Sequence, residues 1–138
     1  MNAYALKGAL ALALAAGAAW PLGAMAQHLD ANGIGRKEVV RHAFDGGREA
    51  IQVKVDFGPQ VAFPKHSHPG VEIAYVLEGA IEYVVDGKPV ILEAGQSLYI
   101  PAGAVHSARN LGNSLASELA TYVVDKNKPV LVLGQPSK

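Results

Sequence analysis

Apolar and polar residues alternate with a period of two along much of the chain, which is typical of β-strands with one buried face. The alternation is cleanest over residues 49–57, where polar residues occupy the other face. The apolar face of this segment carries Ile51, Val53, Val55 and Phe57. We therefore expect residues 49–57 to form a strand that lies on the hydrophobic core.

Turn residues divide the rest of the chain into further short strands. Segments 80–85 and 88–93 flank Asp86-Gly87, a pair typical of a type I′ β-hairpin. Segment 71–78 is apolar on both faces, which predicts burial on both sides. The other expected strands are 37–44, a histidine-bearing segment at 60–68, 97–101, 117–125 and 130–133.

The spacing of these strands predicts an all-β domain, either a sandwich or a barrel. No segment after residue 26 has the pattern of a long helix, and no internal repeat is present. With 138 residues the chain has room for one domain of ordinary size. We assign residues 37–138 to this domain and the polar, glycine-containing residues 27–36 to a flexible lead-in.

Residues 1–26 have the pattern of a signal peptide. An alanine- and leucine-rich run, GALALALAAGAAW, is followed by Ala24-Met25-Ala26, which matches an A-x-A cleavage site. The apolar run is short for a membrane-spanning helix, although an uncleaved anchor or a core helix is the alternative. We expect cleavage after Ala26 and a periplasmic or secreted mature protein with no membrane partner.

Composition narrows the possible functions. Lys and Arg together number 12, as do Asp and Glu, and no basic run is present. We therefore expect no nucleic-acid partner. The chain has no cysteine, which excludes disulfides and thiolate metal ligands.

The candidate chemistry is carried by histidines and one glutamate. His66 and His68 lie two positions apart, so on an extended strand both imidazoles point to the same face. Glu72 has the same parity, and His106 follows further along the chain. Three imidazoles and one carboxylate are suitable ligands for a divalent transition metal.

Two motifs in this region resemble those of the cupin superfamily, in particular its small single-domain members. In G-x5-H-x-H-x3or4-E-x6-G, the last four marked positions are matched by His66, His68, Glu72 and Gly79. The leading glycine position is occupied by Gln60. This departure from the motif concerns a turn of the chain and does not affect any metal ligand. The second motif, G-x5-P-x-G-x2-H-x3-N, is matched throughout by Gly95, Pro101, Gly103, His106 and Asn110.

The resemblance implies a single double-stranded β-helix, the cupin jelly-roll barrel. It implies one divalent transition metal (Fe, Mn, Ni, Cu or Zn) held by His66, His68, Glu72 and His106. It also implies dioxygenase-like chemistry on a small organic molecule, with Glu72 as a catalytic residue that exchanges a proton. The alternative is a non-catalytic periplasmic protein that binds a metal or a small ligand. Small cupins commonly pair their barrels, so we also expect a homodimer.

Other residues are secondary candidates. Parity places Ala74 and Val76 on the same inward face as Glu72. We expect Arg109, His28 and His42 to be solvated rather than part of the site, and we find no further acid or base. Asn110 is expected to cap a turn. Additional candidates for the pocket wall or for packing are Phe63, Tyr75, Tyr83, Tyr99 and Ile100.

Overall fold

The computed structural model describes residues 28–134, so the expected signal peptide lies outside the described residues. The described part contains ten strands and no helix. Within these residues there is consequently no helical segment long and apolar enough to cross a membrane.

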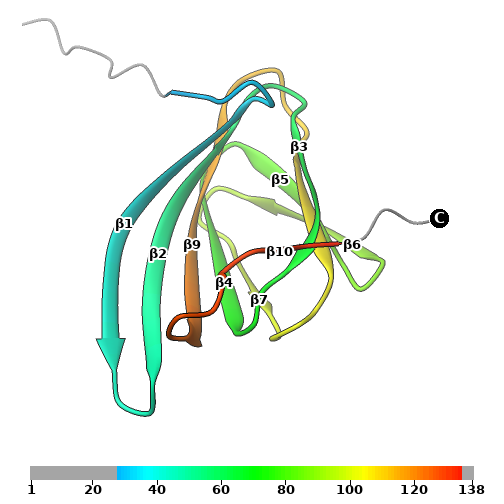
Figure 1. Cartoon of the computed structure of the whole chain (residues 1–138). Coiled ribbons are helices and arrows are strands. Elements are labelled where there is room, and N and C mark those ends of the chain that lie inside the picture. The colour runs from blue at the N-terminus through cyan, green and yellow to red at the C-terminus, as the bar shows by residue number, and fades with distance from the viewer. Residues whose placement is uncertain (1–27, 135–138) are drawn as a thin grey trace, which may run out of the picture.

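The strands form two five-stranded antiparallel sheets that face each other and enclose the core (Figure 1). The first sheet has the order β1 (Ile34–Phe44), β2 (Arg48–Phe57), β9 (Ala116–Asp125), β4 (Val71–Glu78) and β7 (Ser97–Ile100). The second has the order β10 (Val132–Leu133), β3 (Ala62–Ser67), β8 (His106–Asn110), β5 (Ala80–Val85) and β6 (Lys88–Glu93). This arrangement confirms the expected all-β jelly roll.

The regular alternation of β2 and the β5–β6 hairpin are both confirmed. The four apolar residues of β2 are buried in the core, together with residues from both sheets. In the hairpin, Asp86 and Gly87 have φ angles of 48° and 80°, as a type I′ turn requires. Residues 80–85 pair with residues 88–93 in the expected register.

The first strand begins at Ile34, three residues before the expected start at residue 37. The Asp30 carboxylate accepts hydrogen bonds from the backbone N–H groups of Asn32 and Ile34. This local turn directs the chain into β1, and Ile34 enters the core. The last three residues of the expected lead-in therefore belong to the barrel.

The prediction that segment 71–78 is buried on both faces is wrong. Ile73, Tyr75 and Leu77 on the outer face of β4 are 41–44% exposed, whereas Ala74 and Val76 on the inner face are fully buried. The second sheet covers only the inner face of β4, and no other described segment lies over the outer face. The expected homodimer stays a prediction.

Gln60 has a φ angle of 60°, so the position where the first motif has glycine does adopt a left-handed backbone. Its side-chain Nε2 donates a hydrogen bond to the carbonyl oxygen of Leu111 at 2.7 Å. This bond ties the turn before β3 to the loop after β8. It offsets part of the strain of a side chain in the left-handed region.

The order of stability among variants of Gln60 follows from this geometry. Gln60→Ala loses the hydrogen bond but keeps the strain, which costs roughly 1–2 kcal/mol in the left-handed region. Gln60→Gly loses the same bond but removes the strain. We therefore expect Gln60→Gly to be more stable than Gln60→Ala by about 1 kcal/mol in urea unfolding. Equal stability of the two variants would contradict strain at this position.

Candidate metal centre

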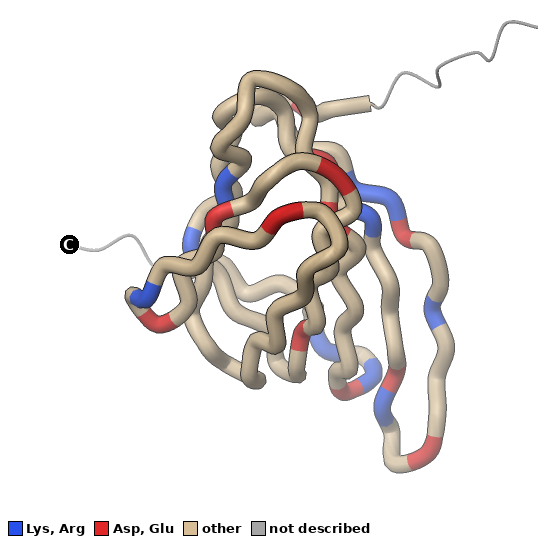
Figure 2. Tube along the Cα trace, turned by 180° about the vertical axis from the view of Figure 1, so that it is seen from behind, with Lys and Arg blue, Asp and Glu red and all other residues tan. Residues whose placement is uncertain are grey.

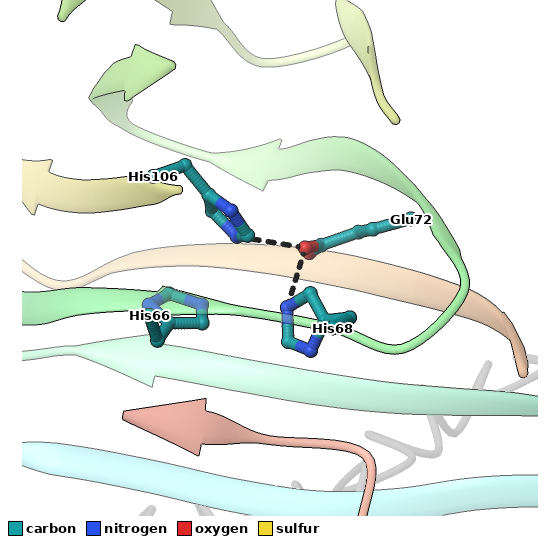
Figure 3. Close-up of side chains that lie close together, drawn as sticks. All are labelled: His66, His68, Glu72 and His106. Atoms are coloured by element: carbon teal, nitrogen blue, oxygen red, sulfur yellow. Dashed lines mark ion pairs between the residues drawn. The ribbon is translucent and has the colours of Figure 1, made fainter. Parts of the chain in front are cut away.

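The four predicted ligands come together inside the barrel, between the two sheets (Figure 3). His66 in β3 is paired directly with His106, the first residue of β8. His68 follows the end of β3, and Glu72 extends from β4 in the opposite sheet. The expectation that the imidazoles of His66 and His68 share one face is confirmed.

The geometry is compact and buried. One ligand atom from each residue lies within 4.8 Å of all the others. The Oε2 atom of Glu72 is 2.9 Å from Nε2 of His68 and 3.1 Å from Nε2 of His106. All four residues are only 3–6% exposed. Such a cluster can surround a single small cation.

Backbone carbonyls orient the three imidazoles. The Nδ1 atoms of His66, His68 and His106 lie 2.8, 2.5 and 3.0 Å from carbonyl oxygens, which can only accept a hydrogen bond. The partner carbonyls belong to Pro64, Val130 and Ala104. The hydrogen-bond network thus assigns the proton to Nδ1 and leaves each Nε2 with a free lone pair. Metal-binding histidines are commonly fixed in this way.

The inner atoms of the cluster have no hydrogen-bond partner. Nε2 of His68, Nε2 of His106 and Oε2 of Glu72 are buried and unsatisfied, although they are about 3 Å apart. Three acceptors cannot satisfy one another, and an unsatisfied buried group is costly. A cation among them would remove this conflict. The residues present therefore fit a divalent transition metal.

The protonation states of Glu72 and His66 also suit a metal. Burial opposes ionisation of Glu72, but the contacts with His106 and His68 outweigh burial and lower its pKa to about 2. Burial lowers the pKa of His66 to about 4. For His106, burial lowers the pKa, but the contact of Nε2 with Glu72 outweighs burial and raises it, so a proton and a metal would compete for this nitrogen. At neutral pH Glu72 is thus a carboxylate and His66 a neutral imidazole, as metal binding requires.

A small inner cavity adjoins the cluster. Its volume is about 10 Å³, near the minimum for one water molecule. Of the candidates for the pocket wall or for packing, Phe63 and Tyr83 line the cavity, and Ile100 is buried in the core. The remaining lining residues are Arg36, Val55, Phe57, His66, Glu72, His106, Ala108, Glu118 and Tyr122. Of these, Arg36, Glu118 and Tyr122 were missed by the sequence analysis.

Glu118 is the acid that the sequence analysis did not find. It is 5% exposed, and its carboxyl group accepts a hydrogen bond from the Tyr83 hydroxyl. Burial, followed by the negative charge of Glu72, raises the pKa of Glu118 to about 7. Glu118 is an even number of residues from the buried Tyr122 and Val124, so all three lie on the same face of β9. A carboxylate on the apolar face of a predicted strand was the available signal.

The raised pKa predicts a pH-dependent effect of Glu118→Gln. The folded protein keeps the Glu118 proton up to about pH 7, whereas the unfolded chain releases it near 4.5. The contribution of the protonated Glu118 to the free energy of unfolding is thus complete below pH 4.5 and is lost as the pH rises through 7. Glutamine imitates the protonated form, so the variant should gain more stability at pH 8 than at pH 5.

Urea unfolding of the metal-free proteins at both pH values measures this difference. Glu93→Gln is the matched control because Glu93 is exposed and outside the cavity. Its effect should stay within about 0.5 kcal/mol at either pH. A gain for Glu118→Gln that is no greater at pH 8 than at pH 5 would contradict the buried protonated state.

The secondary candidates are distributed as follows. Tyr75 and Tyr99 lie on the outer surface, away from the cavity. Arg109 is exposed in β8, with its guanidinium 3.4 Å from the side-chain oxygen of Gln60. His28 and His42 are also exposed and do not line the cavity.

Asn110 confirms its expected role. Its side-chain amide donates hydrogen bonds to the carbonyl oxygens of Phe57, Gly58 and Ser114. Its Oδ1 atom accepts one from the backbone N–H of Gly112. The residue thus joins the end of β2 to the loop after β8.

Comparisons with known proteins agree with this architecture. A germin-like protein of Arabidopsis thaliana, subfamily 3 member 1, is 35% identical over 75 residues. The match covers 50% of this chain and 36% of that protein. Polyketide synthase CurC of Streptomyces cyaneus is 39% identical over 59 residues, which cover 42% of this chain and 38% of that protein. The chain thus spans little more than a third of these curated relatives.

Solved structures share the fold. An oxalate oxidase structure aligns with a TM-score of 0.62 at 24% identity, covering 75% of this chain and 56% of that one. A cupin 2 conserved barrel domain protein from Leptotrichia buccalis aligns with a TM-score of 0.57 at 26% identity, covering 70% and 43%. The family profile described as a cupin domain matches residues 53–124, just over half of the chain. This match includes all four clustered residues, and the chain belongs to the cupin family.

Proposed function

We propose that this cupin holds one divalent transition metal on His66, His68, Glu72 and His106. The observation that supports this most strongly is the set of three buried acceptor atoms without a hydrogen-bond partner. The donor set of three nitrogens and one oxygen suits Fe, Mn, Ni, Cu or Zn. The backbone carbonyls that accept hydrogen bonds from Nδ1 leave Nε2 of all three imidazoles free to bind the metal.

We further propose that the protein is an enzyme acting on a small organic molecule in an oxygen-dependent reaction. A bound metal of this class supplies Lewis acidity and a template that orients reactants. Glu72 contacts His68 and His106 and would be a ligand of the metal, whereas Glu118 lies outside the proposed ligand set and faces the same cavity. Glu118, hydrogen-bonded to Tyr83, is therefore a better proton donor and acceptor than Glu72.

The place of action is part of the same proposal. The pattern of residues 1–26 supports export, with a periplasmic or secreted mature protein. Sequencing the amino terminus of protein recovered outside the cytoplasm tests this point. We expect the mature chain to begin at Gln27.

Elemental analysis of protein purified without added metal, followed by oxygen-uptake assays, tests the enzyme proposal. We expect about one transition-metal ion per chain and oxygen consumption that depends on an organic substrate. Glu118→Gln should keep the metal and lose most of the oxygen uptake. Failure to bind any transition metal on titration would overturn the proposal.

A non-catalytic binding protein is the second candidate. The inner cavity has room for only about one water molecule, which favours a closed binding site over a reaction chamber. Stoichiometric metal with no turnover of any oxygen-dependent substrate would favour this candidate.

A further inference from the structure

The inner face of β1 carries charged residues where a barrel strand usually carries apolar ones. Arg36, Glu38 and Arg41 are paired with Val55, Val53 and Ile51 of β2, so their side chains lie on the same side of the sheet as these core residues. Figure 2 shows Lys, Arg, Asp and Glu positions along the long β1–β2 hairpin.

An outer cavity of about 230 Å³ lies beside this charged face. Three of its lining residues are charged, and three are apolar. The charged ones are Arg36, Glu38 and Arg41, and the apolar ones are Ile51, Val53 and Val130. The volume is below the roughly 300–1,000 Å³ of sites for drug-sized ligands, so it suits a smaller organic molecule.

The outer cavity adjoins the candidate metal centre. Arg36 lines both cavities, with its guanidinium carbon 5.6 Å from the centre of the Phe63 ring. That ring packs against His66 at 4.8 Å. Val130, on the apolar wall, provides the carbonyl that holds His68. A ligand in the outer cavity would therefore lie next to the metal ligands.

The charges in the outer cavity differ in their partners. Arg41 forms ion pairs with two carboxylates, those of Glu38 at 2.8 Å and Glu49 at 2.7 Å, so its positive charge is already balanced within the protein. Arg36 forms no ion pair within residues 28–134. Its positive charge does act on the neighbouring Glu118 and Tyr122, where it offsets part of the rise in pKa that burial causes. Arginine binds carboxylates through two parallel hydrogen bonds. The cation left to bind an external anion is thus Arg36, at the junction of the two cavities.

We propose that the ligand of this site is a small monocarboxylic acid whose carboxylate pairs with Arg36 and whose apolar part lies along Ile51, Val53 and Val130. The inference rests on the proposed function only in taking this ligand to be the substrate. With its carboxylate at the junction, the acid presents its carboxyl end to the metal centre. The apolar end then lies farther out.

Titration calorimetry with hexanoate as the probe tests the proposal. We expect saturable binding, weaker binding of acetate, and much weaker binding of hexanol. Arg36→Gln should weaken hexanoate binding about 10- to 100-fold, the range for a hydrogen bond to a charged group. Val130→Glu, which places a second carboxylate on the apolar wall, should weaken it as well. The matched control is Arg109→Gln, an exposed arginine in β8, which should leave the affinity unchanged.

Two further comparisons separate this inference from the metal proposal. If hexanoate binds by coordination to a metal, chelation should abolish binding and Arg36→Gln should not affect it, which would overturn the inference. If hexanoate still binds after chelation, and Arg36→Gln abolishes this binding, the result would support Arg36 as the carboxylate-binding residue. This conclusion would hold even if the protein took up no metal. Equal affinity for hexanol and hexanoate, or no binding of hexanoate, would also overturn it.

Discussion

His106→Ala is expected to reduce the metal content of the purified protein from about one ion per chain to less than a tenth. His106 supplies one of four ligand atoms that lie within 4.8 Å of one another. Its loss also leaves Oε2 of Glu72 with one fewer neighbour. Removing only an outer-shell partner of a metal ligand typically costs 10- to 100-fold in affinity, so removing a ligand should cost more. Elemental analysis by mass spectrometry measures the result.

His68→Ala should have the same consequence, because His68 holds Glu72 from the other side. The matched control is His42→Ala, an exposed histidine in β1 that faces Ala50 across the sheet. This control should keep its metal. Full occupancy in both ligand variants would show that the metal binds elsewhere, provided that circular dichroism shows a folded barrel.

Asn110→Ala is expected to destabilise the barrel by about 3 kcal/mol, because each buried polar group left without a partner costs roughly 1–3 kcal/mol. The substitution would leave three carbonyl oxygens and one N–H group without the Asn110 amide. Asn110 is 1% exposed, so water cannot readily replace the lost bonds. Equilibrium urea unfolding gives the change in the free energy of unfolding.

Asn113→Ala is the matched control for Asn110→Ala. Asn113 is exposed in the same loop, and its side chain makes one long contact of 3.4 Å with Gln60. The control should change stability by about 0.5 kcal/mol at most. Similar losses in the two variants would refute the role of Asn110 in joining β2 to the loop after β8.

Local elements were the most predictable part of the fold. A two-residue Asp-Gly turn restricts the backbone angles by itself, so the β5–β6 hairpin and its register followed from residues close together in the chain. The start of β1 was missed because the hydrogen bonds of Asp30 to the chain beyond it are not visible as periodicity.

The ligand set was predictable for a different reason. Parity places His66 and His68 on one face of a strand, and the spacing of the second motif adds His106. Burial was less predictable, because the apolar outer face of β4 resembles a buried face in the sequence. Whether another layer covers that face depends on the packing of whole sheets.

The sequence by itself determined the strand pattern, the family motifs and the four residues that converge on the candidate metal centre. Tertiary structure alone decided what surrounds them. Glu118 and Arg36 lie outside both motifs, and pairing of β9 and β1 with β2 brings both to the cavity. Periodicity reports which face of a strand is apolar, but it carries no information on which strands become neighbours.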